Sequence, residues 1–155
     1  MKSSAILSED RVYRYVLYRM WDRSKDCAIF IGLNPSTADE TKNDPTIRRC
    51  MGFAKSWGYG SVYMLNLFAF RATDPDDLVE AEDPVGPRND SYIQIITKYN
   101  GIIVAAWGNH GSWLNRDRQI QAMLPGLYHL GLTKCGQPKH PLYLSAATKP
   151  RLWRK

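Results

Sequence analysis

The chain has 155 residues, of which 44% are hydrophobic and 23% charged, a balance typical of a globular protein that folds as one domain over residues 1–155. No apolar run is long enough to cross a bilayer, and the first residues lack the apolar core of a signal peptide, so we expect a cytoplasmic protein without a membrane partner. Three cysteines without CxxC spacing support neither a disulfide framework nor a zinc site. The net charge of +6 favours an anionic partner such as nucleic acid.

The N-terminal part of the chain is rich in β-prone residues. Residues 12–21 alternate in part between polar and apolar side chains, as a half-buried strand does. A polar turn at 22–26 then leads into the apolar run 28–31. This order predicts an N-terminal β-hairpin made of these two strands.

The apolar run 28–31 ends at a turn that holds a polar side chain in place. Gly32 allows the backbone a sharp exit from the strand, and Pro35 fixes its own φ and removes a backbone donor. Asn34 lies between them at the end of a buried strand, a place where α/β enzymes carry chemistry. Asn34 is therefore the first candidate for a functional residue.

Two helices and a strand are expected next. Asp44 and Pro45 are typical of a helix start, as the N-cap and the first helical residue, and an apolar stripe follows at helical spacing. Residues 61–65 are an apolar run that predicts a buried strand ending in Asn66. A short acidic helix is expected after a cap at Asp74.

The second half of the chain continues this alternation. After a helical pattern, the apolar run 101–106 predicts a strand ending at Trp107, and a further helix is expected over 112–124. Short apolar segments follow at 127–130 and 140–144. Strands that alternate with helices predict an α/β fold with a central, mostly parallel sheet between helices, a three-layer α/β/α arrangement.

Polar and aromatic residues follow the ends of several predicted strands. In open α/β sheets the ligand crevice lies beyond the carboxyl ends of the strands, so we expect Asn34, Asn66, Trp107 and His140 to meet at one site. Each also has a structural explanation on its own: an Asx turn, a strand-end cap, a core aromatic and a hydrogen-bonded loop histidine. Their joint placement favours a functional site.

Four segments resemble motifs of the uracil-DNA glycosylase superfamily, in the same order and over residues 28–148. Residues 32–36, Gly-Leu-Asn-Pro-Ser, resemble its first motif, and 62–66 resemble a strand that ends in a base-reading asparagine. Residues 102–108 resemble the strand that ends in Trp-Gly, and 140–145 are similar to the His-Pro-Ser-Pro-Leu-Ser loop. The resemblance implies a uracil-DNA glycosylase-like fold.

The resemblance also implies a reaction. Such enzymes extrude a base from the DNA stack and hydrolyse its N-glycosidic bond with water. Asn34 would orient the water, His140 would donate a hydrogen bond to a base carbonyl, and Asn66 would pair with the polar edge of the base through a donor and an acceptor. No lysine lies at a position that would support a Schiff-base lyase step, and the mechanism needs no metal or other cofactor.

The chain departs from that superfamily at several positions. Asn34 stands where the fastest members carry aspartate, so we expect slower chemistry, because an amide cannot take a proton. Ser36 replaces a tyrosine that blocks bases with a 5-substituent, so the base pocket is expected to admit larger bases. Leu142 and Tyr143 replace Ser-Pro, while Leu144 keeps the place of the leucine that wedges into the duplex.

Further candidates come from the surroundings of these motifs. Asp44 is most simply a helix cap, yet it is near enough to Asn34 to activate water or read a base amine. Phe68 is a candidate to stack on the base, as are four other aromatic residues: Phe53, Tyr63, Phe70 and Tyr143. The remaining candidates are DNA-backbone contacts: Arg48, Arg49, Arg71, Ser145 and Lys149.

A second resemblance is closer. Residues 34–39, Asn-Pro-Ser-Thr-Ala-Asp, and 43–49, Asn-Asp-Pro-Thr-Ile-Arg-Arg, are similar to signatures of the DUF1643 family of small bacterial and phage proteins, which is uncharacterised. This resemblance identifies relatives of the chain but does not indicate what they do.

Taken together, these patterns predict a monomeric DNA glycosylase that acts on a damaged, deaminated or modified base, in single-stranded DNA or flipped out of a duplex. One alternative is a non-catalytic nucleic-acid-binding module that senses a base. Another is an enzyme that acts on free nucleosides or nucleotides, against which the leucine wedge and the basic C-terminal stretch argue.

Overall fold

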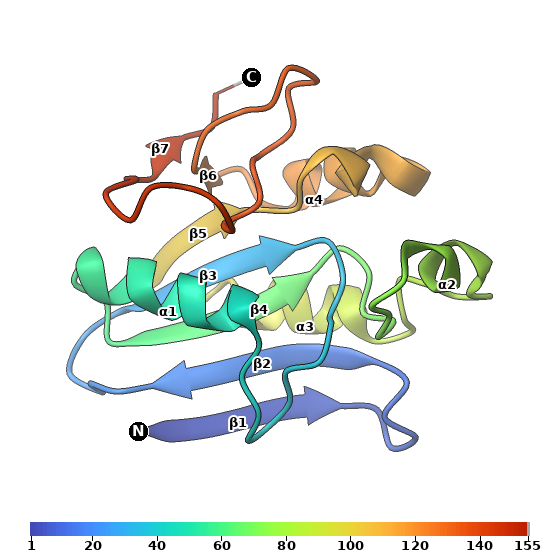
Figure 1. The fold of residues 1–155 in the computed structure, drawn as a ribbon, viewed down its shortest axis with the longest axis horizontal. Helices are drawn as coiled ribbons and strands as arrows, with labels where there is room; N and C mark the ends of the chain where they lie inside the picture. Colours follow the sequence, from blue (N-terminus) through green and yellow to red (C-terminus); the bar gives the residue numbers. More distant parts are fainter. Residues whose placement is uncertain (155) are drawn as a thin grey trace.

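The computed structural model describes residues 1–154 and has a seven-stranded sheet at its centre (Figure 1). The strand order is β1-β2-β4-β3-β5-β6-β7. Their bounds are β1 (Lys2–Leu7), β2 (Arg14–Met20), β3 (Cys27–Gly32), β4 (Ser61–Asn66), β5 (Gly101–Ala105), β6 (Tyr128–His129) and β7 (Arg151–Leu152).

The sheet is mixed. The pairs β4–β3, β3–β5 and β5–β6 are parallel, and β1–β2, β2–β4 and β6–β7 are antiparallel. The parallel strands predicted from the buried apolar runs therefore form the middle of the sheet, and antiparallel strands flank them on both sides. The α/β class is confirmed, with more antiparallel pairing than expected.

The predicted hairpin between 12–21 and 28–31 is wrong. β2 pairs with β1 on one side and with β4 on the other, so β4 separates β2 from β3. The turn after β2 reaches across the start of β4, where Trp21 and Asp22 donate backbone hydrogen bonds to the carbonyl of Gly60 and the amide of Gly60 donates to Asp26. The polar turn at 22–26 thus passes the start of β4 and connects β2 to β3, which are not neighbours in the sheet. The N-terminal hairpin consists of β1 and β2.

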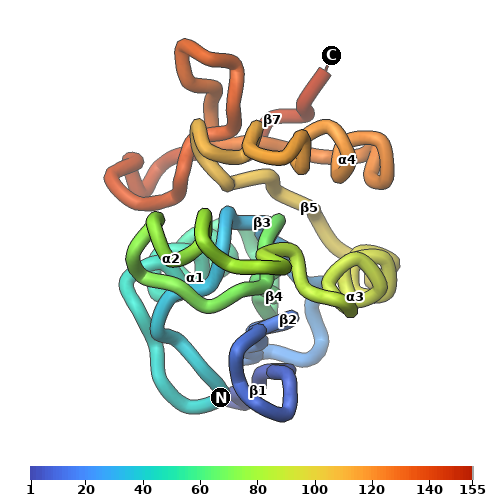
Figure 2. The backbone as a smooth tube through the Cα atoms, turned by 90° about the vertical axis from the view of Figure 1, so that its right-hand side faces the viewer, coloured from blue at the N-terminus to red at the C-terminus, as the bar shows by residue number. Residues whose placement is uncertain are grey.

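Helices cover both faces of the sheet (Figure 2). The helix α1 (Pro45–Ser56) packs its apolar stripe on one face, where its Ile47 and Phe53 join Phe30 of β3. The other face packs against α3 (Asn89–Ile96) and α4 (Arg116–Met123). The short α2 (Pro75–Glu80) lies beyond the ends of the strands. None of the described helices is both long and apolar enough to span a bilayer.

Most helix boundaries agree with the sequence pattern. Asp44 caps α1, where its Oδ1 accepts a hydrogen bond from the amide of Ile47 at 2.9 Å, and Asp74 caps α2 through the amide of Asp76. The helix expected over 112–124 differs, because a 3₁₀ turn, η1 (Asn109–Asn115), comes first and α4 begins at Arg116. Positive φ angles at Leu114 and Asn115 interrupt the helical path between them.

Register in the parallel part of the sheet brings three strand ends together. Gly32 at the end of β3 lies opposite Asn66 at the end of β4, and Ile31 lies opposite Ala105 at the end of β5. The segments that leave these strands therefore begin at the same edge of the sheet.

The bridging turn generates a test of the topology. A Cβ at Gly60 would collide with the carbonyl oxygen of Asp22, so Gly60→Ala should lower the free energy of unfolding by about 2 kcal/mol or more. A Cβ at Gly52, within α1, meets nothing within 4 Å, so the matched variant Gly52→Ala should raise it by roughly 0.5–1 kcal/mol. Urea denaturation measures both free energies of unfolding. Equal stability of the two variants would contradict the close approach of the 22–26 turn to Gly60.

Candidate functional site

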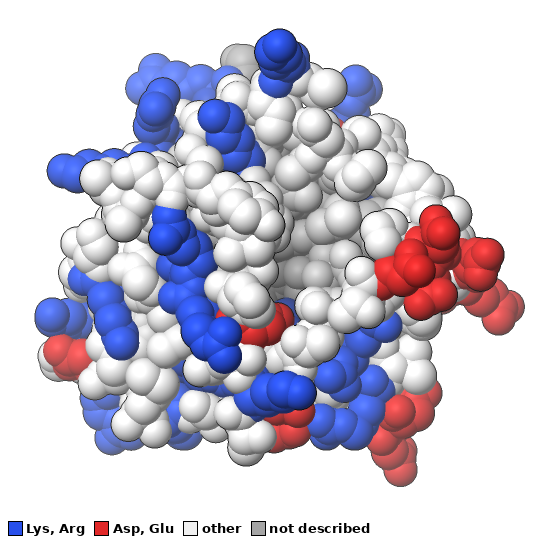
Figure 3. Space-filling model, viewed as in Figure 1, with Lys and Arg blue, Asp and Glu red and all other residues white. Residues whose placement is uncertain are grey.

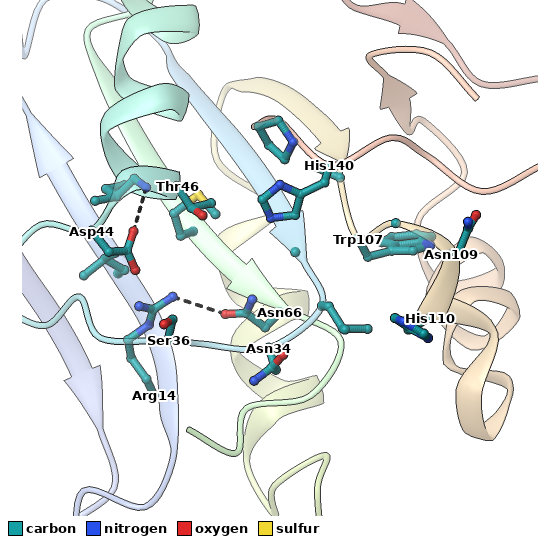
Figure 4. Close-up of a pocket in the computed structure, with 18 residues that line it drawn as sticks. Arg14, Asn34, Ser36, Asp44, Thr46, Asn66, Trp107, Asn109, His110 and His140 are labelled. Carbon is teal, nitrogen blue, oxygen red and sulfur yellow. Dashed lines mark hydrogen bonds between the residues drawn. The ribbon is translucent and has the colours of Figure 1, made fainter. Parts of the chain in front are cut away.

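A cavity of about 330 Å³ opens at the carboxyl ends of β3, β4 and β5 (Figure 4). Five of the predicted site residues line it, together with Trp107: Asn34, Ser36, Asp44, Asn66 and His140. Their meeting at one cavity is the arrangement expected from the strand ends, while their chemical roles stay a prediction. Arg14, Thr46, Asn109 and His110 also line the cavity, and sequence reasoning missed all four.

Asn66 lines the cavity and is only 3% exposed. A Cβ on Gly32 would come within 2.9 Å of its Nδ2, so a glycine is needed beside it in the register of β3 and β4. The Oδ1 of Asn66 accepts a hydrogen bond from Nη2 of Arg14 at 3.3 Å. Its Nδ2 donates to no residue of the described chain and is left for a ligand.

Arg14 begins β2 and is 3% exposed. Its Nη1 donates to the carbonyl of Ala38 at 3.1 Å, and its Nε has no hydrogen-bond partner within residues 1–154. No carboxylate of that part of the chain comes within 4.0 Å of the guanidinium. Burial lowers the pKa of Arg14 to about 10, against the opposing effect of the Asp44 charge, so the side chain is still a cation at neutral pH. The sequence offers one signal for Arg14 as a site residue: it is a charged residue within a strand, and the residues next to it are apolar.

Asp44 holds the loop between β3 and α1 and is 8% exposed. Besides capping α1 through Oδ1, it accepts a hydrogen bond through Oδ2 from the amide of Ala38 at 3.3 Å. Both oxygens are thus engaged by backbone donors. The same loop is tied to the sheet by the buried Arg19, which donates to the carbonyls of Asp39 and Lys42.

Asn34 presents one kind of group to the cavity. Its Nδ2 donates to the carbonyls of Pro35 and Ala72, at 3.1 and 2.7 Å, so both amide hydrogens are used. Its Oδ1 accepts nothing from the described residues. The side chain therefore offers an acceptor, which can orient a water molecule but cannot hold a proton at neutral pH.

His140 stands at the rim of the cavity and points its ring inward (Figure 4). Its Nδ1 accepts a hydrogen bond from the amide of Leu142 at 3.2 Å, which places the ring proton on Nε2 in the neutral form. Partial burial lowers the pKa of His140, and the Asp44 charge opposes this effect in part. The ring is accordingly a neutral Nε2–H donor near pH 7.

Two of the predicted contacts lie outside the cavity. Phe68 is 0% exposed and packs against Trp113 with ring centroids 4.9 Å apart, so it offers no face to a base. Leu144 is half-buried against the core on the α1 side of the sheet and does not project. The residue that projects from this loop is Tyr143, which is 99% exposed and has a φ of 70°.

The predicted backbone contacts lie on the surface. Arg48 is exposed on α1, and Arg49 lies over the ring of Phe53 at 5.1 Å. Arg71 donates to the carbonyl of Arg11, while Ser145 and Lys149 are exposed in the segment after His140.

Charge is distributed unequally around the cavity. In Figure 3 the hollow lies between Lys and Arg side chains on the side of α1 and the C-terminal segment and a group of acidic side chains on the side of α2. The acidic group consists of the cap and helix residues Asp74, Asp76, Asp77 and Glu80. An anionic strand would therefore be attracted on the α1 side and repelled on the α2 side.

A second cavity, of about 370 Å³, adjoins the first and shares Leu33, Asn34, Asn109 and His110 with it. Its other walls are mainly apolar side chains of α2 and η1. The part of the chain that the structure describes contains no group of three His, Cys, Asp or Glu side chains placed to hold a metal ion.

The neutral state of His140 can be tested by NMR. We expect its ring to titrate below the ordinary histidine value of 6.5 and to carry its proton on Nε2 when neutral. Asp44→Asn removes the charge that favours the protonated ring and should lower this pKa further, whereas Asp74→Asn on α2 should leave it unchanged. Titration at or above the ordinary value would contradict the assignment.

Comparison with known proteins gives a family and no activity. The model of the family described as "Protein of unknown function (DUF1643)" matches residues 14–142. No curated protein and no solved structure matches the chain.

Proposed function

The chain belongs to the DUF1643 family, and from the geometry of its cavity we propose that it is a DNA glycosylase-like hydrolase with a water nucleophile. Its substrate is a damaged, deaminated or modified base. The observation that carries the proposal is the set of polar groups at one cavity: the acceptor Oδ1 of Asn34 and the donors Nδ2 of Asn66 and Nε2 of His140. A cavity of about 330 Å³ is of the size that takes a small ligand such as one nucleobase.

The arrangement accounts for both partners of the reaction. The C1′–N bond breaks with its electron pair remaining on the base, and the oxygen of a water molecule forms the new bond to C1′. Asn34 accepts a hydrogen bond from that water, and the proton released ends on the departing base. His140 and Asn66 donate hydrogen bonds to the base where negative charge develops.

The motif resemblance and the fold support the same proposal. Helices on both faces of a sheet with parallel central strands suit the three-layer arrangement of the uracil-DNA glycosylase superfamily, to which we propose this chain is related. The superfamily-like segments 32–36, 62–66 and 140–145 each contribute a wall of the cavity. The small Ser36 leaves room for a substituted base.

The DNA strand is proposed to lie on the α1 side of the cavity. Arg48, Arg49 and Lys149 are among the cations on that side, and Ser145 is an exposed hydroxyl in the same region. The acidic side chains around α2 keep the backbone away from the opposite rim. A strand so placed delivers an extruded or single-stranded base to Asn66.

One observation favours a second candidate function, a base-sensing module without catalysis. Among the residues that the structure describes, Asp44 is the only carboxylate that lines the cavity, and each of its oxygens already accepts a hydrogen bond from a backbone amide. Asn34 cannot take a proton. A pocket that binds a base without hydrolysing its glycosidic bond would have the same features.

Base release separates the two functions. We expect release from oligonucleotides that carry uracil, hypoxanthine, xanthine or a hypermodified pyrimidine, and a loss of about 100-fold in His140→Ala, since one donor to the developing anion is removed. Arg118→Ala, exposed on α4, is the control and should retain full activity. If the protein binds these oligonucleotides without releasing any base, the glycosylase is refuted and the base-sensing module is retained.

The salt dependence of DNA affinity tests the proposed path of the strand. Arg48→Ala should weaken binding and reduce the slope of log affinity against log salt by about one unit, because one phosphate contact is lost. The control Arg118→Ala should change neither quantity. An unchanged slope in Arg48→Ala would place the strand elsewhere.

A further inference from the structure

The second cavity opens directly beside the first, and the boundary between them is held by hydrogen bonds. Asn34 lines both cavities, and its Nδ2 donates to the carbonyl of Ala72, in the wall of the second, at 2.7 Å. Asn109 of η1 also lines both, and its Oδ1 accepts a hydrogen bond from the hydroxyl of Thr133 at 2.6 Å (Figure 4). A ligand that fills the first cavity therefore has the second within reach of its nearest covalent neighbour.

The second cavity suits a flat, largely apolar group. Its volume of about 370 Å³ is close to the 330 Å³ of the first, so it too is of the size that takes one nucleobase. Val79 of α2 is 61% exposed and forms part of its wall, so apolar surface is left uncovered there. Six of the lining residues are apolar or aromatic: Leu33, Ala72, Pro75, Leu78, Val79 and Trp113.

Trp113 gives this cavity an aromatic surface. Its ring packs against the buried Phe68, with ring centroids 4.9 Å apart and an angle of 42° between the planes, so the indole is supported from the core. Nucleobases stack on aromatic side chains whatever their identity, because every base has a π-face. The cavity thus offers a stacking partner that the first cavity lacks at Phe68.

Charge decides which part of a nucleic acid can enter. No Lys or Arg is among the described residues that line the second cavity, and Asp76 is a carboxylate in its wall. Asp74, Asp77 and Glu80 lie on the same helix or its cap, and none of these four carboxylates has a Lys or Arg partner within 4.0 Å in the described chain (Figure 3). A phosphate is repelled here, whereas an uncharged base is not.

We propose that the second cavity holds the base of the nucleotide next to the extruded one, so that the backbone passes on the α1 side and two adjacent bases turn toward α2. The substrate class is then single-stranded DNA, because in a duplex the neighbouring base would also have to be unpaired and unstacked. This inference rests on the proposed function, since it assumes that the first cavity takes a base of a strand.

The test measures the binding of short single strands that resist hydrolysis. The target is uracil or hypoxanthine on a 2′-fluoro sugar, on which fluorine disfavours the positive charge of the transition state. One neighbour of the target is either deoxyadenosine or an abasic tetrahydrofuran residue, so the phosphates are the same. We expect removal of the base on one side to weaken binding roughly 10- to 100-fold, the usual effect of one stacked base, and removal on the other side to change it little. The absence of such a loss on both sides would overturn the inference.

The same strand in a duplex gives a second measurement. We expect the duplex to bind roughly 10-fold more weakly than the single strand, because two base pairs must open in place of one. Equal or tighter binding of the duplex would contradict the single-strand substrate.

Variants of the cavity wall show where the neighbouring base lies. Trp113→Ala removes the stacking surface, and Val79→Asp places a charge on the wall at an exposed position that the fold tolerates. Each should bring the ratio of the two affinities, with adenine and with the abasic neighbour, toward one. Ile95→Asp, at a 52% exposed position of α3 outside both cavities, is the matched control and should keep the ratio. If both wall variants keep it as well, the inference fails.

A large substituent on the target base is the competing occupant of this cavity. It is tested with a strand whose neighbours are abasic and whose target uracil carries a bulky group at C5. We expect this group to leave the affinity close to that of the unsubstituted strand. If the group instead restores the lost affinity, and Trp113→Ala cancels that gain, the cavity holds the substituent and the inference is overturned.

These measurements distinguish the inference from the function on which it rests, because binding of the 2′-fluoro strands needs no hydrolysis. A neighbour effect without base release from any oligonucleotide would retain the inference and refute catalysis. Base release without a neighbour effect would retain the glycosylase and refute the role of the second cavity. A protein that binds none of the strands would refute both.

Discussion

The parallel, in-register pairing of β3 with β4 is the constraint on which the site depends. It sets Gly32 opposite Asn66 at the same edge of the sheet, and the missing side chain at Gly32 leaves the space that the Asn66 amide occupies. The chain that leaves β3 then carries Asn34 to the same cavity. A shift of one residue in this register would turn Asn66 to the other face of the sheet and remove its amide from the cavity.

Two buried arginines of β2 bind the loop between β3 and α1, which forms another wall of the cavity. Arg14 and Arg19 are 3% and 1% exposed, and their partners are carbonyl or amide oxygens, without a carboxylate within 4.0 Å in the described chain. Burying a cation without an ion pair is costly, since backbone dipoles replace only part of the lost hydration. The arrangement ties the loop from residue 36 to residue 44 onto the sheet, and it leaves one of the two charges beneath the cavity.

The chemistry of the cavity follows from which atoms are already occupied. Asn34 has used its donors on backbone carbonyls, Asn66 has used its acceptor on Arg14, and His140 has used Nδ1 on the amide of Leu142. These three side chains leave one acceptor for a ligand, on Asn34, and two donors, on Asn66 and His140. The proposed hydrolysis would use the acceptor to orient a water molecule and the donors to stabilise negative charge on the leaving group.

The sequence by itself determined the local elements and the candidates at their ends. Helix caps at Asp44 and Asp74 and the apolar runs of β3, β4 and β5 depend on neighbouring residues only, so they could be predicted, as could the meeting of Asn34, Asn66 and His140 beyond parallel strand ends. The pairing of β2 with β1 and β4, the burial of Phe68 and the contact of Arg14 with Asn66 were decided by the tertiary structure. Strand neighbours and hydrogen-bond partners join residues far apart in the chain, and no local pattern records whether an arginine on a strand faces water or an asparagine 52 residues away.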